Sequence, residues 1–134
     1  MIHPLSLLKG EKMTADEIFT VVMALMFGED ADKDQYPPFL PMLNIILAET
    51  FDINNAWRRA IGKPEMDEIP LITALTDEVD YEPRILRMVI PYGVAGMLYA
   101  EDDDTGMGDY YRSKYEAAKA AATFAEFSEV EEII

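Results

Sequence analysis

The sequence predicts an all-α fold, a small bundle of about four helices with an irregular loop between the second and third helices. Long segments repeat apolar residues at spacings of three and four, the pattern of a helix with one buried face. The length of 134 residues and the 50% hydrophobic content fit one domain with one core. We expect a single helical domain over 1–134, with a mobile N-terminal lead (1–12) and a partner-binding C-terminal tail (127–134).

The first two helices are marked by local signals at their ends. Thr14 and Glu17 have the spacing of a capping box, which predicts a first helix over roughly 15 to 27. The second helix carries its apolar face from Leu40 to Trp57, and Gly62 is a favoured residue just past a helix end.

The third and fourth helices are expected to form an antiparallel pair. The third runs from about 83 to 100, and Pro91 should bend it because proline removes one backbone donor. The acidic corner 101–106 must reverse the chain in water before a fourth helix over about 106 to 127. The connection 63–82 is expected to be irregular, since no partner strand is evident for its short apolar piece.

The charge and composition disfavour several classes of function. Eleven basic residues against 26 acidic ones give a net charge of -15, which disfavours wrapping nucleic acid. The chain has no cysteine and one histidine, so thiol chemistry and a multi-histidine zinc site within one subunit are excluded. The longest uncharged run, Met88 to Ala100, is too short to cross a bilayer, and no secretory signal is evident.

We expect no enzymatic activity, no cofactor and no metal site. Asp30, Asp32 and Asp34 imitate the first ligand positions of a calcium-binding loop, but Gln35 replaces the required glycine and Pro41 the final glutamate. The motifs of nucleophilic, phosphate-binding and zinc-dependent enzymes are absent from the sequence. The acidic stretch is therefore expected to be a solvated loop.

Several residues are candidates for contacts with another subunit or protein. Aromatic side chains are enriched at interfaces, and scarce positive charges would suit a neighbour's acidic loop, although ion pairs within the chain are the equal alternative for the arginines. Tyr99 and Tyr111 are expected in the core with their hydroxyl groups turned toward water. The interface candidates are Trp57, Arg58, Arg59, Arg84, Arg87, Tyr110, Val130, Ile133 and Ile134.

Four further features lie between Leu43 and Ala118. They are Asn44 within an apolar helix, the entry Tyr81 to Pro83, the turn of helix Pro91 to Gly93, and the acidic and Tyr-Tyr signals of 101–111. This part of the chain resembles the head-tail connector, or adaptor, family of tailed bacteriophages and prophages.

The resemblance implies a structural virion protein of the phage neck, made in the host cytoplasm. It implies a helical bundle that forms a dodecameric ring beneath the portal, with portal, tail or neck proteins as partners and no membrane association. DNA would pass through the ring without specific binding, and Asp102, Asp103 and Asp104 are candidates to line the channel. A C-terminal extension reaching the portal would correspond to 127–134. The alternatives are a tail terminator, another small neck protein, or a cytoplasmic helical protein-binding or regulatory module.

Overall fold

A computed structural model of the chain describes the backbone of residues 12–26 and 37–133, and side chains through residue 123. The fold is mostly helical (69%) with a very small sheet, which confirms the predicted all-α bundle. The helices are α2 (Ala15–Leu25), α3 (Phe39–Ala60), α4 (Pro83–Met88), α5 (Ile90–Glu101) and α6 (Thr105–Ile133), and the strands are β1 (Met13–Thr14) and β2 (Glu78–Val79).

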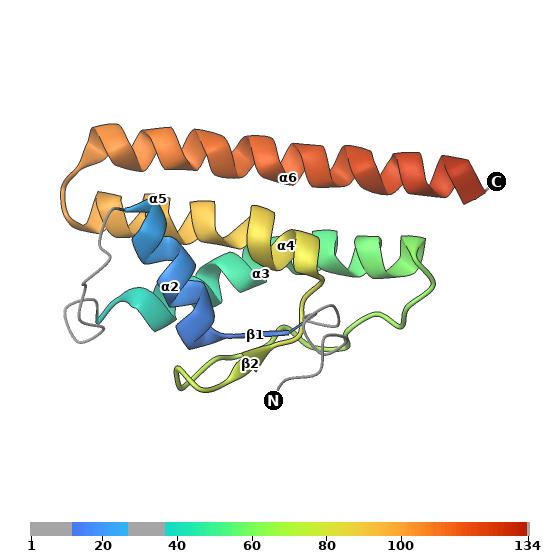
Figure 1. Cartoon of the computed structure of the whole chain (residues 1–134), viewed down its shortest axis with the longest axis horizontal. Helices are drawn as coiled ribbons and strands as arrows, with labels where there is room; N and C mark the ends of the chain where they lie inside the picture. The colour runs from blue at the N-terminus through green and yellow to red at the C-terminus, as the bar shows by residue number, and fades with distance from the viewer. Residues whose placement is uncertain (1–11, 27–36, 134) are drawn as a thin grey trace, which may run out of the picture.

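The helices lie in layers, with α6 along one edge of the bundle and antiparallel to α4 and α5 (Figure 1). Segment 63–82, which carries β2, lies along the opposite edge (Figure 1). Leu47 of α3, Leu86 of α4, Val94 of α5 and Tyr115 of α6 are all buried in one core between these layers.

Helix α2 begins with the predicted capping box. The Glu17 backbone N–H donates to Thr14 Oγ1 at 3.1 Å, and the Thr14 N–H donates to Glu17 Oε1 at 3.1 Å. These two bonds satisfy amides that have no partner inside the helix. The two amides between them are satisfied by the distant loop, since Ala15 N donates to Asp77 O and Asp16 N donates to Leu75 O, both at 2.9 Å.

The small sheet, which has two strands of two residues each, is the main element that the sequence did not predict. β1 pairs antiparallel with β2, with Met13 opposite Val79 and Thr14 opposite Glu78. The short apolar piece of the loop forms no strand, as expected, whereas Glu78 and Val79 just after it do. The partner is the segment leading into α2, which is too short to show an alternating pattern.

The predicted third helix, 83–100, is interrupted at Val89, two residues before Pro91. Proline lacks an N–H and its ring would clash with the carbonyl of the residue four positions earlier, Arg87. Helical hydrogen bonding resumes where Gly93 N donates to Val89 O at 3.4 Å. Pro91 therefore lies in the first turn of a new helix, α5, where its missing donor costs nothing.

Helices α5 and α6 approach each other backbone to backbone. A methyl group added at Gly96 would lie 3.2 Å from Arg112 N and 3.3 Å from Gly108 O. The chain reverses at Asp103, whose φ of 61° is a left-handed conformation that aspartate tolerates better than most residues. Helix α6 continues to Ile133, past the expected end near residue 127.

The tyrosines of the hairpin hold the C-terminus of α2. The Tyr111 ring stacks between Tyr92 and Tyr99, with centroid distances of 6.2 and 5.7 Å. Tyr111 Oη donates to Leu25 O at 2.8 Å and Tyr99 Oη to Met26 O at 3.4 Å. The expectation that these two hydroxyl groups face water was therefore wrong, because carbonyls at the end of a helix lack internal partners and accept from the hydroxyls instead.

Candidate protein interface

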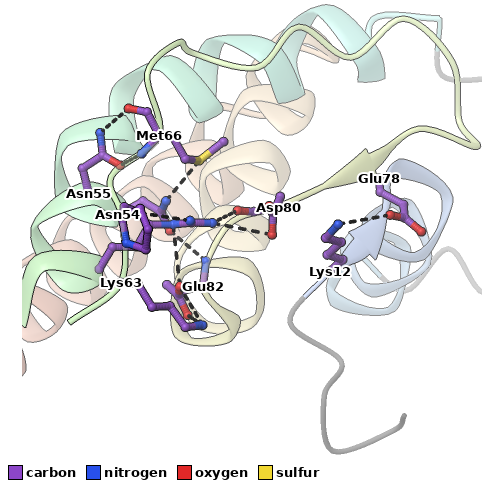
Figure 2. Close-up of polar contacts among 10 residues, drawn as sticks. Lys12, Asn54, Asn55, Lys63, Met66, Glu78, Asp80 and Glu82 are labelled. Carbon is purple, nitrogen blue, oxygen red and sulfur yellow. Dashed lines mark hydrogen bonds and ion pairs between the residues drawn. The ribbon is translucent and has the colours of Figure 1, made fainter. Parts of the chain in front are cut away.

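Segment 63–82 is fastened to α3 by asparagine side chains. Asn44 Nδ2 donates to Ile72 O at 2.9 Å, and Ile72 N donates to Asn44 Oδ1 at 2.8 Å. Asn55 makes the same pair of bonds with Met66, at 3.1 and 2.8 Å (Figure 2). Each asparagine side-chain amide donates and accepts as the backbone of a neighbouring strand would. Met66 and Ile72, which lie outside any strand, therefore still have partners for their backbone groups.

The return half of the segment is fixed by two buried residues of α3 and of the loop. Asn54 Oδ1 accepts from the Glu82 backbone N–H at 2.8 Å, directly before α4. Tyr81 Oη donates to Leu47 O at 2.6 Å. Burial raises the pKa of the Tyr81 hydroxyl well above its ordinary value, so it remains a protonated donor.

A buried carboxylate lies beside these bonds. The Glu82 side chain is 4% exposed, and Lys63 Nζ lies 3.2 Å from both of its oxygens. Arg58 Nε lies 3.6 Å from Glu82 Oε1, while its Nη2 lies 3.5 Å from Asp80 Oδ1 and donates to Asp80 O (Figure 2). Two cations thus compensate one buried anion, and the cluster fixes both ends of the segment to α3.

The basic interface candidates are engaged within the chain. Arg58 belongs to the Glu82 cluster, and Arg59 Nη1 lies 2.8 Å from Glu65 Oε1. The Arg84 guanidinium lies over the Trp57 ring, 5.3 Å from its centroid. Arg87 is exposed on α4 and also has an interaction inside the chain. The alternative of intrachain pairing therefore applies to Arg58 and Arg59.

Tyr110 is the aromatic interface candidate that the structure places at the surface, with 51% of its area exposed. Lys114 Nζ lies 5.1 Å from the centre of its ring and 5.7 Å from that of Tyr92. The side chains of Val130 and Ile133, and all of Ile134, lie outside the described residues, as does most of the N-terminal lead.

The three corner acids are all exposed between α5 and α6. Asp104 has an additional role, because its Oδ1 accepts from Met107 N at 3.1 Å and caps the first turn of α6. The sequence signal for this role is an aspartate directly before a helical pattern. The interpretation of the corner as a channel lining did not take this signal into account.

An exposed apolar strip was missed at the sequence level. It consists of Ile69 and Leu71, which are 49% and 74% exposed and alternate along the extended segment. Of the neighbouring apolar residues Leu71 and Ile72, only Ile72 is buried. Neighbouring side chains of an extended segment point to opposite sides, so one packs and the next faces solvent.

Within 12–26 and 37–123, where side chains are described, no group of three or more acidic or histidine side chains is placed to hold a metal ion. Over the same residues, no helix has the length and apolar character needed to cross a membrane. The calcium-loop imitation at 30–35 lies outside the described residues.

The chain matches no protein-family model, and no curated protein or solved structure shows significant similarity to it.

Proposed function

We propose that this chain is a structural protein of the phage neck, a head-tail connector that assembles into a ring between portal and tail. Two observations support this proposal: the resemblance over most of Leu43 to Ala118, and the contacts that the residues of the resemblance make in the fold. Asn44 fastens segment 63–82 to α3, and Tyr81 holds the end of that segment through Leu47 O. A ring needs subunits whose loops keep one conformation, because every interface repeats the same contact.

The observation that carries the proposal is the fastened loop beside a tightly packed helical hairpin. Gly93 permits the contact with Ile46 and Tyr115, since an added methyl group would lie 2.9 Å from each side chain. Pro83 occupies the first turn of α4 directly after the Asn54–Glu82 bond. The residues of the resemblance are thus packing and fastening residues, which suits a protein that works by its shape.

The negative charge supports passage of DNA rather than its retention. Asp102, Asp103 and Asp104 are exposed at one end of the α5–α6 hairpin, in a chain of net charge -15. A wall of carboxylates repels the phosphate backbone and supplies none of the cations that stable DNA binding requires.

The oligomeric mass tests this function. Native mass spectrometry and negative-stain electron microscopy of the full chain should reveal closed rings, alone or after addition of portal protein. Virions should contain the chain in the neck, which immunogold labelling would locate. A monomer or dimer under all of these conditions would contradict the ring and favour a helical protein-binding module. Labelling at the tail end would favour a tail terminator.

The C-terminal segment provides a second test. Helix α6 reaches Ile133, and we propose that 127–134 docks on the portal or on a neighbouring subunit. Deletion of residues 128–134 should leave the melting temperature of the monomer nearly unchanged, because the core is formed by residues 15–122. The same deletion should abolish incorporation into particles. A truncated protein that assembles normally would exclude this role of the segment.

A further inference from the structure

The apolar strip of Ile69 and Leu71 is held in place while it is exposed. Met66 and Ile72, which flank Ile69 and Leu71 in sequence, are each bound to an asparagine of α3 through both backbone groups. Exposed apolar side chains on a fixed backbone lose little further freedom when a partner covers them, which lowers the entropic cost of docking. The strip therefore has the features of a contact surface.

Acidic residues border the strip. Asp67 and Glu68 are exposed directly before Ile69, and no ion pair among the described residues includes either carboxylate. Glu65, by contrast, is paired with Arg59. A partner for this surface must combine an apolar or aromatic group with a positive charge.

The same combination occurs on α6. Tyr110 is half exposed, and the exposed Lys114 lies over the rings of Tyr110 and Tyr92; we call these three residues the Tyr–Lys patch. The neighbouring cations of α6, Arg112 and Lys119, are both paired with Glu116, at 3.4 and 3.2 Å. Among the residues that the structure describes, no carboxylate forms an ion pair with Lys114.

The segments that carry the two surfaces lie along opposite edges of the molecule. Helix α6 runs along one edge, and segment 63–82 runs along the other, with α3, α4 and α5 between them (Figure 1). The strip and the Tyr–Lys patch of one chain therefore cannot meet each other. A contact between the strip of one copy and the patch of another is heterologous, and it can be repeated from subunit to subunit.

We propose that the apolar strip docks on the Tyr–Lys patch of a second copy of this chain. The Tyr110 ring covers Leu71, and Lys114 faces Asp67 and Glu68. The inference rests on the proposed ring and adds which two surfaces join its subunits. It follows from charge complementarity and from the placement, along opposite edges, of the segments that carry the two surfaces.

Two single substitutions each remove one surface. Leu71→Asp places a charge in the strip, and Lys114→Glu reverses the charge of the patch. Both residues are exposed, so the melting temperature should stay close to that of the parent. Each variant should raise the dissociation constant for self-association about tenfold or more, measured by sedimentation velocity of the full chain. Met88→Asp is the matched control, because Met88 is also exposed but lies outside both surfaces.

A mixture of the two variants gives the sharpest test. Leu71→Asp retains the patch and Lys114→Glu retains the strip, so an equal mixture should form a one-to-one dimer and nothing larger. Combining Lys114→Glu with Asp67→Lys and Glu68→Lys in one chain should restore self-association. A mixture that remains monomeric, or variants that associate like the parent, would overturn the proposal.

The outcomes separate this proposal from the proposed function. Rings that form normally with Leu71→Asp and Lys114→Glu would reject the named surfaces and leave the neck function intact. One-to-one dimers in the mixture, with no ring formed by the parent chain, would support the surfaces and contradict the ring. A parent chain that stays monomeric and binds through the strip only to a basic segment of another protein would overturn the proposal.

Discussion

At the scale of single residues, Gly93 is required by the space around it. A Cβ at this position would lie 2.9 Å from Ile46 Cδ1 and 2.9 Å from Tyr115 Cε1. The Tyr115 ring cannot move away, because it is buried and its hydroxyl donates to Glu49 Oε1 at 2.8 Å. Gly93→Ala should therefore lower the free energy of unfolding by about 1 to 3 kcal/mol, measured by urea denaturation.

Gly106 provides the matched control in the first turn of α6. The nearest atom to an added Cβ is Asp104 Oδ1, at 3.9 Å, and the residue has no positive φ. Gly106→Ala should be neutral or stabilise the protein by about 0.4 to 1 kcal/mol, since alanine loses less backbone entropy in a helix. Equal effects of the two substitutions would show that the space around Gly93 accommodates a methyl group.

Asp77 makes the turn of segment 63–82 sensitive to acid. Its Oδ2 accepts from Thr73 N at 2.9 Å, Ala74 N at 3.1 Å and Thr73 Oγ1 at 3.3 Å. The bonds to the backbone amides of Thr73 and Ala74 lower the pKa of Asp77 from its ordinary value. A carboxyl group whose pKa is lower in the folded state than in the unfolded state stabilises the folded state at pH values above its unfolded pKa. This contribution to stability is lost as the pH falls through the folded pKa.

The expected result follows from that sign. The parent should be more stable than Asp77→Asn at neutral pH, and the difference should shrink as the pH falls below about 3.9. Thermal melts of both proteins across the acid range would measure it. A difference that stays constant down to pH 2 would mean that the Asp77 carboxylate does not hold the turn.

At the scale of elements, local signals predicted the helices and missed the contacts between distant segments. The capping box of α2 and the glycine after α3 are readable within a few residues, and the observed helix ends lie close to the predicted ones. The β1–β2 pair joins short segments far apart in sequence, so neither carries a periodic pattern. Asn44 stands out in sequence as an amide within an apolar helix, but its partner, Ile72, is defined only by the fold.

The fastened segment gives a prediction at this scale. Asn44→Ala removes both bonds to Ile72 and leaves its backbone groups without their side-chain partner. The Ile72 amide should then exchange its hydrogen at least about tenfold faster, because the segment opens locally at lower free energy. The Met66 amide, held by Asn55, is the internal control and should change less. Nuclear magnetic resonance would follow both amides, and equal acceleration would indicate that the segment opens as one unit.

At the scale of the whole molecule, composition predicted the sign of the electrostatic field, and the structure divided the candidate residues into two groups. Arg58 and Arg59 form ion pairs inside the chain, and Arg84 covers Trp57, whereas Tyr110 remains at the surface. Sequence alone could not make this division, because the acidic partners come from a loop whose path depends on the asparagines of α3.

The field predicts weak contact with DNA. With 26 acidic and 11 basic residues, the isolated chain should give no shifted band with duplex DNA at submicromolar concentration and about 0.15 M salt. Stable binding requires cations that displace counterions from the phosphates, and most described cations are already paired with carboxylates. A salt-sensitive complex in a gel-shift assay would contradict this expectation.

The acidic corner allows the charge of the proposed channel to be changed without changing the fold. Asparagine tolerates the left-handed conformation of Asp103, whose φ is 61°, and can accept the Met107 N–H bond in place of Asp104. Asp102→Asn, Asp103→Asn and Asp104→Asn together should therefore preserve the melting temperature and the assembly. Loss of these charges should slow DNA passage in particles, measured as the rate of ejection, because phosphates are repelled less from the wall. Unchanged ejection with intact particles would place the corner outside the channel, whereas a large loss of stability would mean that the carboxylates have a structural role beyond capping α6.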